Sequence, residues 1–511
     1  MTTQQLDPPK PAVEHDVSPQ SGRGIGRALG KSSAIYTGAA LINKAIGFVL
    51  LPIYAHALTP AEYGSVAAVT MIGIVLHELL ALAQGAAIIR FYHEHPEGSP
   101  ELRRFVGTAL TTVLSTSLVV GAALLVVGDV LLTPLLDGIP FWPLMAIGVG
   151  IAAVQPFVNV YLLVLQTSRR PTAFGIATVG SALSRTLLAI GLVAGLGWKA
   201  EGVLTAHLIA AAVVFAGVLF SMRGRVELCF DRHHAARSLR YSGPILVHTV
   251  GTAFRTILDR MFLVNLLGTA AAGVYHIGFQ LSSLVQIGCV SAHKSLNPLF
   301  MRAMHEDDTR RLDNIRNLGL TLVVLYTFGA TALSLAAPEV VALFASDAYR
   351  DASGVVPLLA FAFVASGIYG LLSNVLFFER STSRRVGLVT LASIGFGAIA
   401  NAVLIGPFGI HGAAIATLLG QLLFLVVVAF MIRRHAPFAW PYGRFAAVFV
   451  TGFVASLIPL FTDGDEISAR GIAVKLAVLT AVFVSTSWLA WGSPWFLIRE
   501  LRGGSWPRRE E

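Results

Sequence analysis

The segment NVYLLVLQTSRR (159–170) recurs as NVLFFERSTSRR (374–385), an offset of 215 residues along the chain. Both copies begin with Asn-Val and end with Thr-Ser-Arg-Arg. Three further landmarks recur in the same order at nearly the same offset: Pro143-Leu144 with Pro357-Leu358, Gly202 with Gly412, and Gly64 with Gly273. One matching tetrapeptide arises by chance, but four ordered matches indicate that the chain contains two copies of one unit.

The composition indicates what each unit is made of. The 511 residues are 55% hydrophobic and only 13% charged, whereas about a quarter of the residues of a water-soluble domain are charged. A helix needs about 20 apolar residues to cross the ~30 Å hydrocarbon core of a bilayer. We predict fourteen spans, near residues 33–56, 64–88, 105–127, 142–165, 172–195, 202–221, 242–266, 273–296, 317–336, 355–377, 386–405, 411–432, 445–461 and 471–492.

The predicted fold is therefore an all-α polytopic membrane protein with 14 transmembrane helices, arranged as two parallel six-helix repeats plus two C-terminal helices. Because each repeat has an even number of spans, both enter the membrane in the same sense, a plan typical of transporters with a site between the halves. The predicted boundaries are a disordered cytoplasmic tail (1–31), two six-helix bundles (32–240 and 241–436), two additional helices (437–498) and a cytoplasmic tail (499–511).

Basic residues are sorted between the connectors, which alternate along the chain. Most of the 37 Lys and Arg residues fall on one set, including Arg103, Arg170 and Arg223, whereas the other set carries mostly acids such as Asp137. Loops rich in Lys and Arg stay in the cytoplasm. We therefore predict a multi-pass protein with both termini cytoplasmic. The net charge of +9 is spread as short arginine pairs at span ends, so it indicates anchoring rather than nucleic-acid binding.

Ionisable side chains within membrane spans are costly and mark functional sites by default. Seven stand out within the predicted spans: Lys44, Glu78, Arg185, Arg255, Asp259, Arg260 and Lys294. All of these except Arg185 lie in spans 1, 2, 7 and 8. Other polar residues recur on the same spans at helical spacing. Such stripes predict one hydrated cavity lined by both halves, and five cations against two anions predict that it attracts an anionic group.

Two sets of candidate residues follow. The candidates for the cationic cavity are Lys44, Arg185, Arg255, Arg260, Lys294 and Arg90, and the candidates for ion coupling are Glu78, Asp259, His77 and His248. Glu78 is the first choice for coupling, because it has no Lys or Arg within a turn and burial favours the protonated form of a carboxylate.

Structural alternatives stand beside these roles. Arg255 and Asp259 are i,i+4 neighbours that could simply neutralise one another, whereas Arg260 points about 100° away from Asp259 on an ideal helix. Lys294 is close enough to a span end to reach water. Arg90 at the end of span 2 resembles an ordinary anchor, and a lone buried histidine is usually a hydrogen-bonded lining residue.

The sequence contains neither a nucleotide-binding P-loop nor a spaced metal-ligand cluster nor a catalytic serine motif. We therefore expect a transporter rather than an enzyme. No catalytic residue, metal site or cofactor is expected, and an H⁺ or Na⁺ gradient would supply the energy.

Three passages resemble the Wzx-type polysaccharide-biosynthesis flippases of the multidrug/oligosaccharidyl-lipid/polysaccharide (MOP) exporter superfamily. They are GFVLLPIYAHALTPAEYGSVAAV (47–69) with GAAIIRFY (85–92), the region 239–300, and GPFGIHGAAIATLLGQ (406–421). The resemblance implies a flippase that moves undecaprenyl-diphosphate-linked oligosaccharide across the bacterial inner membrane, for O-antigen, capsule or exopolysaccharide biosynthesis. It also implies membrane lipids, a polysaccharide polymerase and glycosyltransferases as partners, and no nucleic acid.

Other functions remain open at this point. A multidrug or small-metabolite antiporter would share the fold, but its commonly cationic cargo would favour an acidic cavity. A membrane glycosyltransferase or polymerase typically carries a long external loop with catalytic residues, and the external connectors here are short. An assembly scaffold for glycan synthesis is a further alternative.

Overall fold

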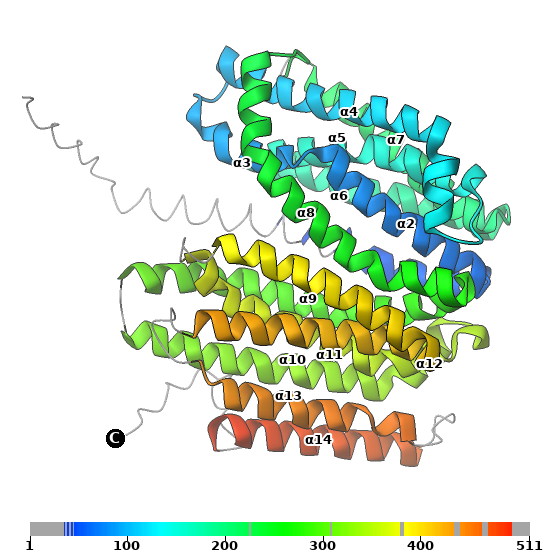
Figure 1. Ribbon diagram of the computed structural model, residues 1–511, viewed down its shortest axis with the longest axis vertical. Helices are drawn as coiled ribbons and strands as arrows, with labels where there is room; N and C mark the ends of the chain where they lie inside the picture. The colour runs from blue at the N-terminus through cyan, green and yellow to red at the C-terminus, as the bar shows by residue number, and fades with distance from the viewer. Residues whose placement is uncertain are drawn as a thin grey trace, which may run out of the picture.

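The computed structural model describes residues 35–492 with gaps at 36–37, 40–41, 44, 224–225, 307–308, 379–382, 434–439 and 462–468; for some helical residues, among them 301–312 and 374–388, it describes the backbone alone. Lys44 is thus outside the described residues. Every regular element in the described part of the chain is a helix (Figure 1).

The helices match the predicted spans in order and approximate length. The first span is described as a helix over Ala45–Ala57. The rest of the first half contains α2 (Pro60–Ala81), α3 (Gln84–Phe91), α4 (Pro100–Leu132), α5 (Ala146–Thr167), α6 (Pro171–Ala189) and α7 (Lys199–Met222). The second half and the C-terminal pair contain α8 (Arg232–Leu267), α9 (Thr269–Glu306), α10 (Thr309–Phe344), α11 (Ala352–Phe378), α12 (Ser383–Ile432), α13 (Tyr442–Ser456) and α14 (Ala469–Trp491).

The predicted all-α membrane fold is confirmed. Within the described residues, nine helices are long and apolar enough to cross a bilayer. The long α12 covers two predicted spans, because Gly409 interrupts the helix with a φ of 57°, and this left-handed conformation suits glycine. Helices α8 and α9 have the length to span, and they carry charged residues such as Arg255, Asp259 and Lys294 along it.

The second span differs from its prediction as one continuous helix over 64–88. It breaks at Leu82 and Ala83, which both have a φ of 49°, and α3 begins at Gln84. No Gly or Pro marks this break, and left-handed residues with a Cβ are uncommon, so the surrounding tertiary structure must hold them. Gln84 is fully buried, and neither amide atom has a hydrogen-bond partner among the described residues.

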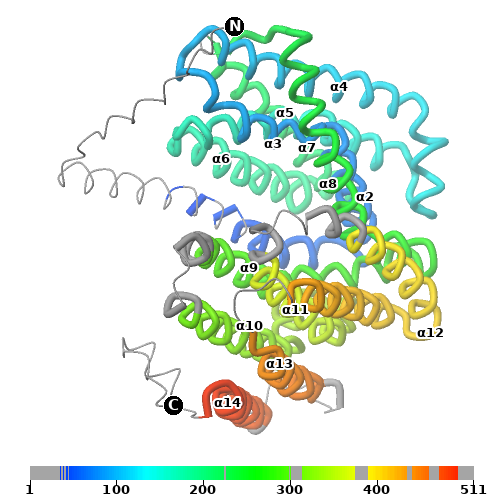
Figure 2. The backbone as a smooth tube through the Cα atoms, turned by 60° about the vertical axis from the view of Figure 1, so that its left-hand side comes forward, coloured from blue at the N-terminus to red at the C-terminus, as the bar shows by residue number. Residues whose placement is uncertain are grey.

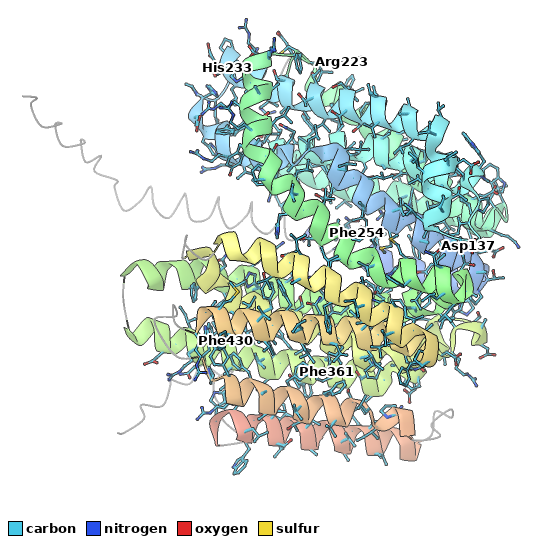
Figure 3. All side chains as sticks on the ribbon, in the orientation of Figure 1. Asp137, Arg223, His233, Phe254, Phe361 and Phe430 are labelled. Atoms are coloured by element: carbon cyan, nitrogen blue, oxygen red, sulfur yellow. The ribbon has the colours of Figure 1, made fainter. Side chains whose placement is uncertain are left out.

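Helices α2–α7 form one group and α9–α14 the other, with α2 packed against α9 (Figures 1 and 2). Helix α8 runs between the groups and contacts α2, α3 and α4 as well as α9 and α12. The helices run between two chemically different ends. Figure 3 labels Arg223 and His233 at one end and Asp137 at the other. We call these the basic end and the acidic end.

A close contact between the halves joins α2 to α9, and its two sides are related by the internal repeat. A Cβ built on Gly64 would lie 1.8 Å from the Thr269 carbonyl oxygen, and one built on Gly273 would lie 2.0 Å from the Pro60 carbonyl oxygen. Pro60 and Thr269 are separated by the same 209 residues as the two glycines. Each copy therefore presents the same glycine and carbonyl to the other, and only glycine permits this approach of the two backbones.

Candidate functional site

A polar cavity of about 140 Å³ opens in the second half, between α8, α9, α11 and α12. Arg255 and Asp259 of α8 both line it, as their i,i+4 spacing predicts. The other polar lining residues are Thr256, Gln286, Ser366, Ser393, Asn401, Thr417 and Gln421. The cavity thus holds the Arg255 guanidinium, the Asp259 carboxylate and many neutral hydrogen-bonding groups, a lining that suits a polar head group.

Arg255 is the available cation of this cavity. Its guanidinium carbon lies 5.2 Å from the centroid of the Phe424 ring, at the distance of a cation–π contact. In the part of the chain that the structure describes, no carboxylate lies within 4.0 Å of it. The alternative in which Arg255 and Asp259 neutralise one another is therefore wrong.

Asp259 is instead engaged by its sequence neighbour. The Arg260 Nη1 atom lies 3.3 Å from Asp259 Oδ1, which also accepts the Arg260 backbone N–H at 2.8 Å. The Tyr275 hydroxyl donates to Asp259 Oδ2 at 2.6 Å. The expectation that Arg260 points away from Asp259 is thus wrong, because its long side chain folds back along the helix and donates to the Thr256 carbonyl at 3.0 Å.

Arg260 is buried in the protein rather than presented to the cavity. Its exposed fraction is 1%, and its guanidinium carbon lies 3.8 Å from the centroid of the Phe279 ring. Its Nε and Nη2 atoms have no hydrogen-bond partner among the described residues. The structure therefore places Arg260 as a buried partner of Asp259.

Arg185 is a candidate of the cationic cavity that lies in the first half. This half-buried side chain of α6 donates from Nη2 to Asn43 Oδ1 at 3.2 Å, which connects α6 to the first span. Tyr54 and His207 lie within electrostatic range of its guanidinium. Like Arg255, it has no carboxylate within 4.0 Å in the described ranges.

His77 and Glu78, two of the ion-coupling candidates, are neighbours on α2, and His77 is hydrogen-bonded to Asn159 of α5. Asn159, the first residue of the repeated motif, lies 2.8 Å from His77 Nε2, and His77 Nδ1 lies 3.6 Å from Glu78 Oε1. The Glu78 carboxylate also lies close to the Thr249 hydroxyl of α8. Glu78 has 33% of its side chain exposed and is accessible to ions. It projects from α2 toward α8, the first helix of the second half.

Three candidates lie outside these groups. Lys294 and His248 are exposed on α9 and α8. Arg90 pairs with Glu94 at 3.1 Å, and Arg237 of α8 pairs with the same carboxylate at 2.6 Å, the geometry of an anchor at the basic end. No described contact joins Arg185 to Arg255, so the single cavity shared by both halves stays a prediction.

The sequence reasoning missed several polar residues. Gln286, Asn401 and Gln421 line the cavity of the second half. The one sequence feature that could have identified them is the position of an amide side chain within an apolar span. An ion pair between Lys475 of α14 and Glu339 of α10 was missed as well. It ties the C-terminal helices to the second half.

More than half of the chain matches the model of one protein family. Residues 29–304 match the family model described as "Polysaccharide biosynthesis protein", which is more than half of the chain. The chain belongs to this family. This match confirms the resemblance drawn from the sequence passages above.

Relatives and solved structures agree with the assignment. "Lsg locus putative protein 1" of Haemophilus influenzae is 22% identical over 282 residues, which cover 54% of this chain and 67% of that protein. The lipid II flippase MurJ in an inward closed conformation matches with a TM-score of 0.72 and 12% identity, over 89% of this chain and 98% of that chain.

Two structures of a multidrug resistance MATE family transporter of the MOP superfamily also match. The inward-facing structure has a TM-score of 0.61 and 17% identity, over 80% of this chain and 95% of that chain. The outward-facing one has a TM-score of 0.51 and 15% identity, over 81% and 96%. This chain therefore shares a MOP-type fold and a multi-pass membrane architecture with these structures.

Proposed function

We propose that this protein is a flippase that moves an undecaprenyl-diphosphate-linked oligosaccharide from the inner to the outer leaflet of the bacterial inner membrane. Its membership of the polysaccharide biosynthesis family and its fold likeness to a lipid II flippase support lipid-linked glycan as cargo. The glycan would be a unit of an O-antigen, a capsule or an exopolysaccharide. The basic end would face the cytoplasm, with both termini inside.

The observation that carries the proposal is the pair Arg185 and Arg255. Arg185 of the first half and Arg255 of the second both lie within predicted spans, and neither has a carboxylate within 4.0 Å in the described ranges. A diphosphate offers several anionic oxygens to such donors, and charge-assisted hydrogen bonds to phosphate are short and strong. Because the two cations lie on opposite halves, the diphosphate could bind first to one half and then to the other during transport.

Alternating access fits the internal duplication. The same fold is seen in both inward-facing and outward-facing transporters, and the halves here meet through a symmetric glycine contact. A rocking motion about such a contact would expose a site between the halves to one leaflet and then to the other.

Glu78 is the preferred coupling residue. Both carboxylate oxygens of Asp259 are already engaged, by Arg260 and by Tyr275. Among the described residues, the groups beside the Glu78 carboxylate are His77 and Thr249 rather than an Arg or Lys, so this carboxylate would be free to exchange H⁺ or Na⁺. Binding there would bias one conformation if the ion has different affinities for the two states.

The test is transport of the lipid-linked oligosaccharide in proteoliposomes by Arg185→Gln and Arg255→Gln, with Arg223→Gln at the basic end as the control. Losing a charge-assisted bond to phosphate costs about 1.5–3 kcal/mol, so each site variant should transport roughly 10- to 100-fold more slowly. The control should match the wild type. Wild-type transport by both site variants, at equal protein levels, would overturn the cationic-site proposal.

The coupling role has a separate test. Glu78→Gln keeps the side-chain size and removes the exchangeable charge. We expect this variant to equilibrate cargo at a rate that no longer responds to an imposed H⁺ or Na⁺ gradient. An unchanged gradient response would exclude Glu78 as the coupling residue.

A further inference from the structure

A second cavity, of about 170 Å³, lies at the basic end of the first half, away from Arg185 and Arg255. It is enclosed by the end of α5, the start of α4 and the short helix Tyr92–Glu94 that follows α3. Its floor is apolar and its rim is polar. The floor includes Leu102, Val106 and Val164, and the rim includes Tyr92, Arg103 and Arg170.

Both rim arginines are available to an anion. Arg103 and Arg170 are exposed, and among the described residues neither has a carboxylate within 4.0 Å. Arg170 reaches the rim because Arg169, just after α5, adopts a left-handed φ of 52° and turns the chain. The neighbours Arg104 and Arg169 do not line the cavity. The fold therefore places one arginine of each sequence pair, Arg103 and Arg170, at the cavity rim.

Neutral donors complete the rim. Tyr92 is only 7% exposed, and its hydroxyl lies within hydrogen-bonding reach of Ser168. Burial raises the pKa of Tyr92 and nearby Glu97 adds to this, against smaller opposing effects of Ser168 and Arg170. The hydroxyl therefore stays protonated and can donate to an anion.

The start of α4 adds a favourable field. Ser99 caps this 33-residue helix by accepting the Leu102 backbone N–H at 3.2 Å. The positive end of the helix dipole thus lies at the cavity, where it stabilises negative charge.

The position of the cavity relates it to the lipid headgroups. A helix of 33 residues is about 50 Å long, whereas the hydrocarbon core is about 30 Å thick. Because the predicted span begins at residue 105 and α4 begins at Pro100, the first turn of α4 is expected in the headgroup region. An apolar floor beneath a cationic rim at this level matches a phosphate attached to an apolar body better than a free anion, since basic pockets between helices at this boundary bind anionic headgroups.

We propose that this cavity binds the phosphate of an anionic phospholipid from the leaflet at the basic end, with Arg103 and Arg170 on the phosphate and the glycerol ester region against the floor. The site is separate from the proposed cargo site and is independent of it. Bound lipid would bridge α4, α5 and the Tyr92–Glu94 turn, and would thereby stabilise the first half.

The test measures binding of phosphatidylglycerol and of zwitterionic phosphatidylcholine to the purified full-length protein in detergent, by the ligand-induced shift in thermal unfolding. We compare the wild type with Arg103→Gln/Arg170→Gln and with the matched control Arg104→Gln/Arg169→Gln, which removes the same charge from the same connectors. The wild type and the control should bind phosphatidylglycerol, and the site variant should bind it at least about tenfold more weakly. Phosphatidylcholine should produce little shift in any of them.

Two outcomes would overturn the proposal. Equal weakening by both double variants would mean that general surface charge, rather than the cavity, attracts the lipid. A shift with millimolar inorganic phosphate as large as that with phosphatidylglycerol would mean that the site takes a free anion. If the arginine variant does not fold, Tyr92→Phe serves in its place, because it removes one donor and keeps the ring; unchanged phosphatidylglycerol binding by Tyr92→Phe would then overturn the site.

Discussion

The symmetric contact of Gly64 with Gly273 yields the sharpest prediction about the conformational cycle. A Cβ at position 64 would lie 1.8 Å from the Thr269 carbonyl oxygen, and real Cβ atoms essentially never approach closer than 3.0 Å. Gly64→Ala therefore requires α2 and α9 to separate by at least about 1.2 Å. The obstacle is backbone, so no side-chain rotation relieves it.

The size of the effect follows from packing energetics. Forcing an extra carbon into a close contact costs about 1–3 kcal/mol. Applied to the state in which α2 and α9 touch, this cost shifts the ratio of conformations roughly 5- to 150-fold. Since the contact lies toward the acidic end, at the first turns of both helices, Gly64→Ala and Gly273→Ala should each favour the conformation that is open at that end.

The assay is a distance distribution between spin labels at Asp129 and Asp351, both exposed near the acidic end, in a protein without its two native cysteines. The matched controls are Gly73→Ala on α2 and Gly288→Ala on α9, where a Cβ would meet nothing within 4 Å. The site variants should lengthen the mean distance, and the controls should not. If Gly64→Ala gives the same distribution as Gly73→Ala, the contact does not close this end and the reasoning is refuted.

Three further predictions concern stability. Tyr275→Phe leaves Asp259 Oδ2 without its 2.6 Å donor and should lower the unfolding free energy by about 1–3 kcal/mol, with Asp259→Asn giving a non-additive double variant in thermal unfolding; additive effects would argue against the pair. Lys475→Met leaves a partly buried carboxylate unpaired and should destabilise by about 1–2 kcal/mol, and adding Glu339→Gln should recover part of this loss, whereas no recovery would exclude the ion pair as its cause. The backbone N–H groups of His234 and His233 hold the pKa of Asp231 below its usual value. In the wild type, the hydrogen-exchange protection factors of the first turn of α8 should therefore fall as the pH drops through that lowered pKa. In Asp231→Asn, the same protection factors should stay constant over this acid range.

Much of the fold follows from the sequence because the bilayer allows few solutions. Backbone polar groups in hydrocarbon must be satisfied within the segment, so apolar stretches of about 20 residues become helices. The structure places α4, α5, α7 and α11 within a few residues of their predicted spans. The duplication was visible for the same reason, since Asn159 and the Thr-Ser-Arg-Arg motif recur at equivalent span ends.

The break in the second span was not predictable in this way. Apolar periodicity continues through Leu82 and Ala83, and neither residue favours a left-handed conformation. The structure nevertheless holds both there, since contacts with other helices outweigh local preference. A one-dimensional pattern carries no record of those contacts.

For the charged residues, the sequence indicated their positions along the spans but not their partners. The sequence by itself indicated most of the ionisable groups within the predicted spans, because each span is read directly from its apolar length. Only the tertiary structure decided their partners: Asp259 pairs with adjacent Arg260 and with Tyr275, and Arg255 is left to face a cavity. Side-chain partners depend on rotamers and on helices distant in sequence, so helical spacing identified the face and the fold decided the contact.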